Sequence, residues 1–422
     1  MNNPIRILRE RGLIESVTSD EIEKIFDQPQ KVYCGFDPTS DSLHLGNLVA
    51  IMGLAWFYKC GHTPIAVVGG ATGMVGDPSG KSQERPLLDE QTIGKNLSGI
   101  RKNIESIFTS IPSDANLLVL NNMDWIGQFT FLEFLRDVGK HFRLGPMLAK
   151  ESVRNRLNSE EGMSFTEFSY QLIQGYDFLY LFNHYGVKTQ MGGSDQWGNI
   201  TAGTELIRKL KGQQAYGLTL PLLTSSEGKK LGKTEKGAIW LSPEKLSTYE
   251  FYQYLYRTDD RDVIKLLRML TFMDMEEIRF YENKLQTHPN LAQKRLAEEV
   301  TRTVRGNEEL TQAIKITEGI KPGSEAILDA DALETIAEGM PSCDLYKEHV
   351  IGSSIVDLLV LSSLQTSKGQ AKRLIQNGGA YLNNKKIDNE NTLIQVDDLI
   401  EGKLILLSAG KKNRMLIRIK DA

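Results

Sequence analysis

The chain has 422 residues, of which 40% are hydrophobic and 25% are charged, and its net charge is −4. This composition is typical of a soluble globular protein with two to four domains. No apolar run is long enough to span a bilayer, and the N-terminal residues lack the apolar segment of a secretion signal. Three widely spaced cysteines favour a reducing compartment, the cytoplasm, and give no spacing typical of a metal site.

Predicted strands and helices alternate in the first half of the chain. Residues 32–36, 63–70 and 117–120 read as buried strands, and residues 45–60 and 88–108 read as helices. This order predicts an α/β domain over residues 1–242, with a doubly wound, Rossmann-like parallel sheet. Ligands of such sheets bind at the carboxyl ends of the strands, so the loops after the first two strands are candidates.

The rest of the chain is expected to form two more parts. Residues 243–340 are charged and helical, and residues 341–352 read as a linker. Residues 353–422 begin with helices and continue in short β-type runs, which predicts a small α+β domain. From Gln365 onward there are eleven Lys and Arg but only six Asp and Glu, so a basic tail follows an acidic body. We therefore expect this last domain to bind RNA.

A polar loop precedes the helix at residues 45–60. Thr39, Ser42 and His44 lie near the unpaired N–H groups of a helix N-terminus, which attracts phosphate. Gly46 removes a Cβ where a base or ribose could approach the backbone. A simpler alternative is an ordinary capped helix with Ser42 as the N-cap.

The glycine-rich segment "GGATGMVGDPSGKS" (69–82) invites comparison with a P-loop. That motif requires Gly, four residues and then Gly-Lys-Ser or Gly-Lys-Thr. Val75 stands where its first glycine is needed, and Pro78 is unsuited to the turn. We therefore reject a P-loop ATPase. A flexible connection would explain the glycines but not Asp77 among them.

One predicted helix carries polar groups within an apolar segment, "FSYQLIQGYDFLYLF" (168–182). Tyr170, Gln174 and Asp177 stand at positions i, i+4 and i+7, which places them on one face. A phenol, an amide and a carboxylate on one stripe could bind a small polar ligand. An exposed face is the alternative, but the surrounding Phe, Leu and Ile argue against it.

Two later motifs carry candidate nucleotide ligands. In "QMGGSDQWGNI" (190–200), Asp195 follows a Gly-Gly turn and could hold a ribose hydroxyl, although a plain polar turn is the alternative. The segment "SSEGKKLGKTEKG" (225–237) is either a solvated surface loop or a mobile clamp on a polyphosphate. Its four cations are Lys229, Lys230, Lys233 and Lys236.

The order of these motifs resembles a known family. "HLGN" (44–47) and "KLGKT" (230–234) are similar to the HIGH and KMSKS signatures of class I aminoacyl-tRNA synthetases. With "YCGFDPT", "GDPSGK", "YQLIQGYD" and "GGSDQWGN", nearly the whole chain resembles the bacterial-type tyrosyl-tRNA synthetases. The tail "TSKGQAKRLIQNGGAYLNNKKI" (366–387) resembles a small RNA-binding fold first known from a ribosomal protein. In the signatures, Asn47 replaces the final His of HIGH, and both lysines of KMSKS remain.

The resemblance implies a two-step ligase. L-tyrosine and ATP, the latter with Mg²⁺, would give tyrosyl-adenylate and pyrophosphate, and the tyrosyl group would pass to the 3′ end of tRNA(Tyr). It implies no prosthetic group and no covalent enzyme intermediate. It also implies a cytoplasmic homodimer with no membrane association, in which the helical domain lies on the anticodon side.

The resemblance also implies a role for individual residues. The implied catalytic residues are Thr39, His44, Asn47, Lys230, Lys233 and Thr234. The implied tyrosine-binding residues are Tyr33, Asp77, Tyr170, Gln174, Asp177 and Gln196. The implied ATP-binding residues are Cys34, Gly35, Asp37, Gly46, Gly193, Asp195 and Lys233. Lys81 and Arg85 lie near the same phosphate-facing loop, and no metal ligand is expected.

The basic tail suggests how RNA would bind. Lys368 and Lys372 share a helix face, Arg373 flanks it, and Lys385 and Lys386 lie at a predicted β-turn. Such a row of cations suits RNA phosphates, which dominate this kind of affinity.

Two other functions remain open. A tryptophanyl relative would share both signatures, but Tyr33 and Asp177 are suited to a phenol, whereas an indole offers only a donor. A catalytically inactive RNA-binding paralogue is the second alternative, and the intact His44, Lys230 and Lys233 argue against it.

Overall fold

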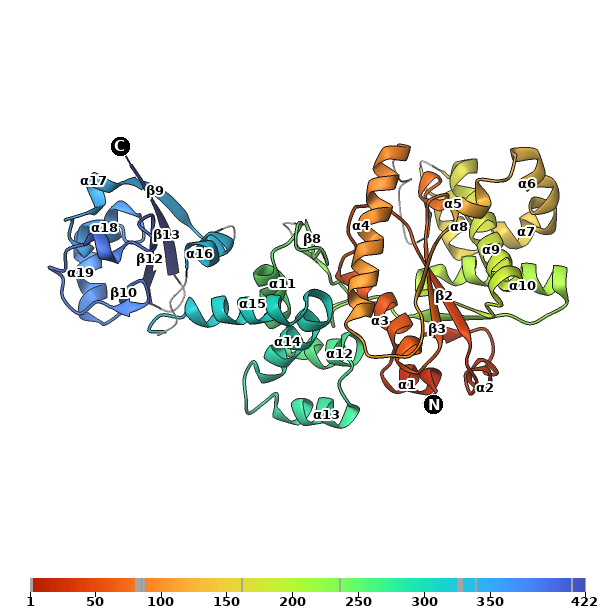
Figure 1. Ribbon diagram of the computed structural model, residues 1–422, viewed down its shortest axis with the longest axis horizontal. Helices are drawn as coiled ribbons and strands as arrows, with labels where there is room; N and C mark the ends of the chain where they lie inside the picture. The colour runs from red at the N-terminus through yellow and green to blue at the C-terminus, as the bar shows by residue number, and fades with distance from the viewer. Residues whose placement is uncertain are drawn as a thin grey trace. The chain divides into compact units, whose positions relative to one another are not determined.

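The computed structural model describes residues 3–79, 85, 88–160, 162–234, 237–324, 329–337, 340–410 and 413–421. The chain divides into two compact units (Figure 1). Unit 1 comprises residues 1–246 and 256–304, and unit 2 comprises residues 247–255 and 305–422. No helix within these described ranges combines the length and the apolar character that a membrane crossing requires.

Unit 1 is built on a six-stranded sheet. Its strands lie in the order β1 (Ser16–Val17), β6 (Tyr216–Leu220), β5 (Thr189–Gly193), β2 (Lys31–Phe36), β3 (Thr63–Val68) and β4 (Leu118–Asn121). All pairs from β6 to β4 are parallel, and only β1 pairs antiparallel. β3 and β6 are apolar and buried along nearly their whole length, as expected for strands covered on both faces. The predicted doubly wound sheet is confirmed.

Helices cover both faces of this sheet. On one face, Gly53 of α3 (Leu45–Lys59) lies so close to Met191 and Leu220 that no larger residue would fit without movement. On the opposite face, Gly217 lies against Ile200 of α10 (Trp197–Lys211), and α9 (Phe165–Tyr185) packs beside α10. α3 therefore begins at the carboxyl end of β2 and runs along the sheet.

The ends of the long helices follow from local sequence. Ser164 caps α9 by accepting from the N–H of Glu167, and Gly186 ends it with a φ of 69°. Asp89 caps α4 (Glu90–Thr109) in the same way. The other elements of unit 1 are α1 (Pro4–Glu10), α2 (Ile22–Ile25), α4 (Glu90–Thr109), α5 (Met123–Ile126), α6 (Phe131–Asp137), α7 (Leu144–Leu148), α8 (Glu151–Leu157), β7 (Lys233–Thr234), β8 (Gly237–Ala238), α12 (Asp260–Leu270), α13 (Met275–Lys284) and α14 (Leu291–Arg305).

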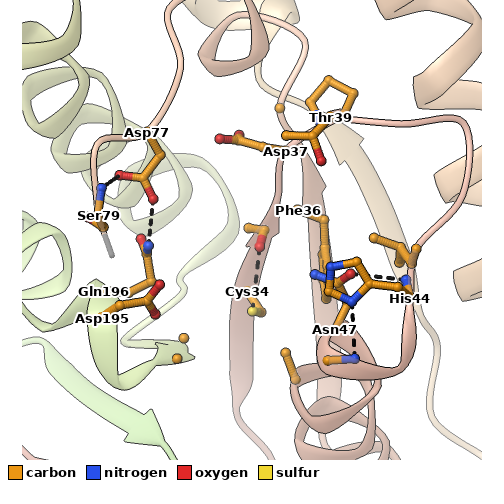
Figure 2. A pocket seen from close by; sticks show the side chains of 18 of the residues that line it. Cys34, Phe36, Asp37, Thr39, His44, Asn47, Asp77, Ser79, Asp195 and Gln196 are labelled. Carbon is orange, nitrogen blue, oxygen red and sulfur yellow. Dashed lines mark hydrogen bonds between the residues drawn. The ribbon is translucent and has the colours of Figure 1, made fainter. Parts of the chain in front are cut away.

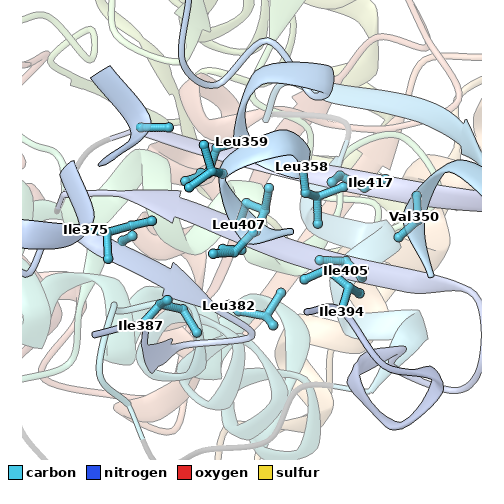
Figure 3. Packing of buried hydrophobic residues seen from close by; sticks show 14 of the residues in the cluster. Val350, Leu358, Leu359, Ile375, Leu382, Ile387, Ile394, Ile405, Leu407 and Ile417 are labelled. Atoms are coloured by element: carbon cyan, nitrogen blue, oxygen red, sulfur yellow. The ribbon is translucent and has the colours of Figure 1, made fainter. Parts of the chain in front are cut away.

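Unit 2 is built on a five-stranded sheet. Its order is β11 (Lys385–Lys386), β10 (Ala380–Leu382), β12 (Leu404–Ala409), β13 (Asn413–Lys420) and β9 (Ser342–Tyr346). Ile405 and Leu407 pack on one face with α18 (Ile355–Leu361) and α19 (Lys368–Gln376), as Figure 3 shows. The alternate residues Leu404 and Leu406 pack on the other face with α11 (Thr248–Tyr256), α15 (Asn307–Gly319) and α16 (Ala330–Ala337).

The predicted linker at residues 341–352 is wrong. This segment contains β9 and the short helix α17 (Lys347–Val350), and β9 pairs in parallel with β13. Every second residue of β9 is exposed, so nothing local marks it as part of a core. The predicted helical part, residues 243–340, is also divided, because α12–α14 belong to unit 1 and the helices on either side belong to unit 2. The other predicted domain boundaries stay predictions.

Candidate active site

A cavity of about 960 Å³ opens at the carboxyl ends of β2 and β5. The chain runs from β2 to β3 and β4 on one side and continues with β5 and β6 on the other. This cavity therefore lies at the topological switch point, where open parallel sheets bind their ligands. Its size suits a small-molecule site. All residues that the sequence predicted for tyrosine, ATP and catalysis line this one cavity.

Two walls of the cavity are visible in Figure 2. Asp77, Asp195 and Gln196 lie on one wall, and Thr39 and His44 lie on the other, with Cys34 of β2 between them (Figure 2). The first set follows β3 and β5, and the second follows β2. Groups distant in sequence thus meet because parallel strands end at one edge of the sheet.

His44, and not Ser42, caps helix α3. The Nδ1 atom of His44 accepts from the N–H of Gly46 at 3.1 Å, and Asn47 Oδ1 accepts from the N–H of His44 at 3.1 Å (Figure 2). The hydroxyl of Ser42 instead donates to Asn103 Oδ1 at 3.1 Å. A Cβ at Gly46 would lie 2.9 Å from the His44 ring, so this glycine makes room for the cap, and its predicted contact with the nucleotide stays a prediction.

This cap decides what the two signature residues can offer a ligand. Because Nδ1 of His44 accepts a hydrogen bond, a neutral ring carries its proton on Nε2. The oxygen of Asn47 is held by the cap, so its amide N–H groups are the donors that it can offer. Both residues line the cavity, and both can donate to a phosphate oxygen.

Asp177 is buried at the inner end of the cavity. It accepts from Trp125 Nε1 at 2.7 Å and from Asn122 Nδ2 at 3.1 Å. Burial raises the pKa of Asp177 to about 7, against the lowering effect of these two donors. The carboxylate is thus held in a fixed orientation with part of its acceptor capacity left for a ligand.

Asp77 adds a second buried carboxylate, and Asp37 adds a half-buried one. Asp37 accepts from the hydroxyls of Tyr170 and Thr72, both at 2.8 Å. Burial, followed by the charge of Asp77, raises the pKa of Asp37 to about 6. Asp77 accepts from Ser79 N at 3.0 Å and from Gln196 Nε2 at 2.6 Å (Figure 2).

Three carboxylates that line one cavity favour a cationic ligand group such as an ammonium. In the part of the chain that the structure describes, no cluster of three or more His, Cys, Asp or Glu is arranged to hold a metal ion. The contact of Asp37 with Tyr170 associates it with the predicted tyrosine residues, and its predicted role in ATP binding stays a prediction.

Three buried polar atoms of residues that line the cavity have no hydrogen-bond partner among the described residues. They are the Tyr33 hydroxyl, Gln174 Oε1 and Gln190 Oε1. Leaving such atoms unsatisfied costs about 1–3 kcal/mol each, so a ligand with matching groups would be favoured. Burial, and then the charge of Asp177, raises the pKa of Tyr33, which therefore stays a protonated donor.

Sequence reasoning missed several residues of this site. Gln190 was not singled out, nor was Asn199, whose amide approaches Asp77 at 3.4 Å. Asn122 and Trp125, which hold Asp177, lie more than 50 residues before it in the chain. The signal that could have found Asn122 is its place directly after β4, at the same sheet edge.

The residues predicted for ATP line a further part of the cavity. The thiol of Cys34 is buried, and burial followed by the charge of Asp195 raises its pKa to about 12, so it stays protonated. A Cβ at Gly193 would lie 2.6 Å from Asp195 Oδ1, which explains the glycine. Lys230 and Lys233 line the outer part and are exposed. Lys81 and Lys236 lie outside the described residues, whereas Arg85 lines the cavity.

The predicted RNA-binding cations are all exposed on unit 2. Three of them pair with carboxylates: Lys368 with Asp357, Lys372 with Glu390, and Lys386 with Asp388, at 2.6–3.2 Å. Such exposed pairs contribute little to stability, so RNA phosphates could replace them.

Comparisons with known proteins agree with this geometry. Residues 26–320 match the family model of class I tRNA synthetases (W and Y), and residues 332–417 match the C-terminal domain of SYY-like tyrosine–tRNA ligases. The chain is 63% identical to a tyrosine–tRNA ligase of Protochlamydia amoebophila over the full length of both. It is 52% identical to a chloroplastic/mitochondrial tyrosine–tRNA ligase of Arabidopsis thaliana, covering 99% of this chain and 84% of that one.

A solved structure gives the same result. A C-terminally truncated mitochondrial tyrosyl-tRNA synthetase of Aspergillus nidulans is 32% identical, with a TM-score of 0.67. The match covers 74% of this chain and 92% of that one. The chain therefore belongs to the tyrosine–tRNA ligase family of class I synthetases.

Proposed function

We propose that this chain attaches L-tyrosine to tRNA(Tyr) in two steps. In the first step, a tyrosine carboxylate oxygen attacks the α-phosphorus of ATP, the bond to the bridging oxygen breaks, and pyrophosphate leaves. In the second step, a hydroxyl of the 3′-terminal ribose attacks the tyrosyl carbonyl, and AMP leaves. Neither step needs a protein nucleophile, so the enzyme contributes positioning and charge stabilisation.

The inner end of the cavity binds tyrosine in this proposal. Tyr33 donates to the phenol oxygen, and the phenol donates to Asp177. Asp77, Tyr170 and Gln174 hold the ammonium group, and Gln196 orients Asp77 through its 2.6 Å hydrogen bond. The supporting observation is that Tyr33 and Gln174 carry buried polar atoms without partners.

The outer part binds ATP, which brings Mg²⁺ with it as part of the substrate. Cys34, Gly35, Gly193 and Asp195 lie along the ribose, with Asp37 and Gly46 at its edge. The leaving pyrophosphate is held by groups from two segments. These groups are Thr39, His44, Asn47, Lys230, Lys233 and Thr234.

The observation that carries the choice of amino acid is the pair at the inner end. A phenol is both a donor and an acceptor, and the pair offers an ionisable carboxylate together with a buried hydroxyl. An indole has only a donor, so it would leave the Tyr33 hydroxyl unsatisfied. This argues against tryptophan as the substrate.

The test is ATP–pyrophosphate exchange measured with each amino acid separately. We expect exchange with tyrosine and little with phenylalanine or tryptophan. Equal exchange with phenylalanine, or exchange only with tryptophan, would contradict the assignment. Absence of exchange with every amino acid would instead support the inactive RNA-binding paralogue.

The active form is proposed to be a homodimer. Phe131 and Leu132 of α6 and Leu144 and Leu148 of the following helix α7 are exposed, Leu132 by 75%. Exposed apolar side chains in this number suggest an interface with a second copy. Light scattering should give twice the chain mass, and Leu132→Glu should give the single mass. A wild-type mass of one chain would contradict the dimer.

The expected cytoplasmic location stays a prediction.

A further inference from the structure

The two segments that hold the pyrophosphate in the proposed function are joined by main-chain hydrogen bonds. Leu45 N donates to Ile239 O, and Leu241 N donates to Leu43 O, both at 2.8 Å. Ile239 N in turn donates to Gly232 O at 2.9 Å. The turn that contains His44 is therefore held directly against the segment that follows the β7–β8 hairpin.

Helix α4 supports the same turn from the other side. Asn96 Nδ2 donates to Pro38 O at 2.9 Å, and Asn103 Oδ1 accepts from Leu43 N at 2.9 Å. Between them, a Cβ at Gly99 would overlap the carbonyl oxygen of Asp41 at 1.9 Å. Asn96, Gly99 and Asn103 share one helix face, and this face fits the backbone of the loop before His44.

Asp41 lies where these supports meet. Its carboxylate pairs with Lys95 of α4 at 3.1 Å and with Lys245, which follows the hairpin. Lys245 also donates to Ser40 Oγ at 2.9 Å and lies 4.5 Å from the centre of the Trp240 ring, which itself lines the cavity. Lys245, which contributes most, and Lys95 lower the pKa of Asp41 to about 2, so the carboxylate is ionised at neutral pH.

We propose that Asp41 is a positioning residue for adenylate formation. This proposal rests on the proposed function. Its carboxylate fixes the loop from Thr39 to His44 between α4 and Lys245, and so sets the spacing between His44 and the hairpin lysines. Asp41 does not line the cavity, so we place it outside contact with the substrates. It acts through Thr39 and His44, which take the charge of the leaving pyrophosphate.

The test is pre-steady-state kinetics of Asp41→Asn. A displaced phosphate-binding loop should lower the rate of adenylate formation by about ten- to a hundredfold. The pyrophosphate concentration that gives the half-maximal rate of the reverse reaction should rise as well. The Kd for tyrosine should stay within about twofold of the value for the unaltered chain. Lys245→Met should have a similar effect, and the double variant should be no slower than Asp41→Asn alone.

Glu105→Gln is the matched control. Glu105 pairs with Arg101 on the same helix α4, at 2.9 Å and on its exposed side, and we expect no kinetic change. An Asp41→Asn variant that forms the adenylate at an unchanged rate would overturn the proposal. A parallel loss of tyrosine affinity and rate would also overturn it, because it would indicate a general structural role. If the unaltered chain forms no tyrosyl-adenylate, the proposed function fails instead.

Discussion

Selectivity at the residue scale depends on buried polar atoms that only the correct ligand satisfies. Trp125 and Asn122 fix Asp177, and Phe178 packs against the ring of Tyr33 with their centroids 5.3 Å apart. Neither polar group can turn away when a smaller ligand binds. Phenylalanine would leave the Tyr33 hydroxyl without a partner and Asp177 without a donor from the ligand, which is the situation that a hydrogen-bonding pocket uses to reject an analogue.

Tyr33→Phe should therefore weaken the discrimination between tyrosine and phenylalanine. One neutral hydrogen bond contributes about 0.5–1.5 kcal/mol, so the ratio of kcat/KM values should fall by about two- to tenfold. Asp177→Asn should lower it further, because an ionised acceptor is lost. Tyr180→Phe makes the same chemical change outside the cavity, on a ring stacked on Trp125, and should leave the ratio unchanged. An unchanged ratio in both pocket variants would place the phenol elsewhere.

Tyrosine binding should also depend on pH. Asp37 and Asp177 have raised pKa values of about 6 and 7, so in the free protein each carries a proton over part of the range from pH 5 to 8. The pKa values of these groups are higher in the folded chain than in the unfolded chain. Their contribution to folding stability therefore decreases as the pH rises from about 4 to 7. An ammonium and a phenol both favour the ionised carboxylates, so binding should release protons and strengthen as pH rises from 5 to 8.

Calorimetry in two buffers with different ionisation enthalpies would measure this proton release. Asp37→Asn and Asp177→Asn should each remove part of it. Tyrosine affinity that is constant across this range, with no proton release, would show that both carboxylates are already ionised in the free protein.

Residue patterns predicted some of this site but not all of it. Tyr170, Gln174 and Asp177 were found because helical spacing is a local property, and all three line the cavity. The Ser42 cap was wrong because the outcome depended on Asn103, about 60 residues away, which binds Ser42 and frees the cap position for His44. No local pattern carries that information.

At the scale of elements, the lysine segment is part of a short hairpin. β7 and β8 pair through Lys233–Ala238 and Thr234–Gly237, and Thr224 bridges to Lys230. This arrangement presents Lys230 and Lys233 at the cavity, exposed to solvent. The sequence predicted a mobile loop, because its glycines and lysines do not indicate strand pairing.

Lys230→Ala and Lys233→Ala should each slow adenylate formation by about ten- to a hundredfold. An exposed lysine that meets pyrophosphate mainly in the transition state affects the rate and leaves tyrosine affinity nearly unchanged. Lys229→Ala is the control, since Lys229 pairs with Glu227 and does not line the cavity. A large loss of tyrosine affinity at an intact rate would assign the hairpin another task.

Strands and helices in the first half were predicted well because buried parallel strands and amphipathic helices have clear periodicities. β9 was missed because a parallel edge strand with exposed alternate residues resembles a linker in sequence. Its pairing with β13 depends on a segment some 70 residues later, so only the folded chain reveals it.

At the scale of the whole molecule, the two proposed tasks separate along the chain. Every residue that lines the cavity lies between residues 33 and 240, within unit 1, whereas the exposed basic residues of the tail belong to unit 2. A cut near Gly352, as the predicted linker would suggest, leaves β9 without its partner strand. A cut after Ile320 avoids this, because it follows α15 and removes the five-stranded sheet complete.

A chain of residues 1–320 should therefore form tyrosyl-adenylate but lose most tRNA charging. The removed part carries Lys368, Lys372, Arg373, Lys385 and Lys386, and each lost phosphate contact also removes part of the salt dependence of tRNA binding. Active-site titration of both chains would correct for misfolded protein. If exchange and charging then fell by the same factor, the tail would support the catalytic unit rather than bind tRNA.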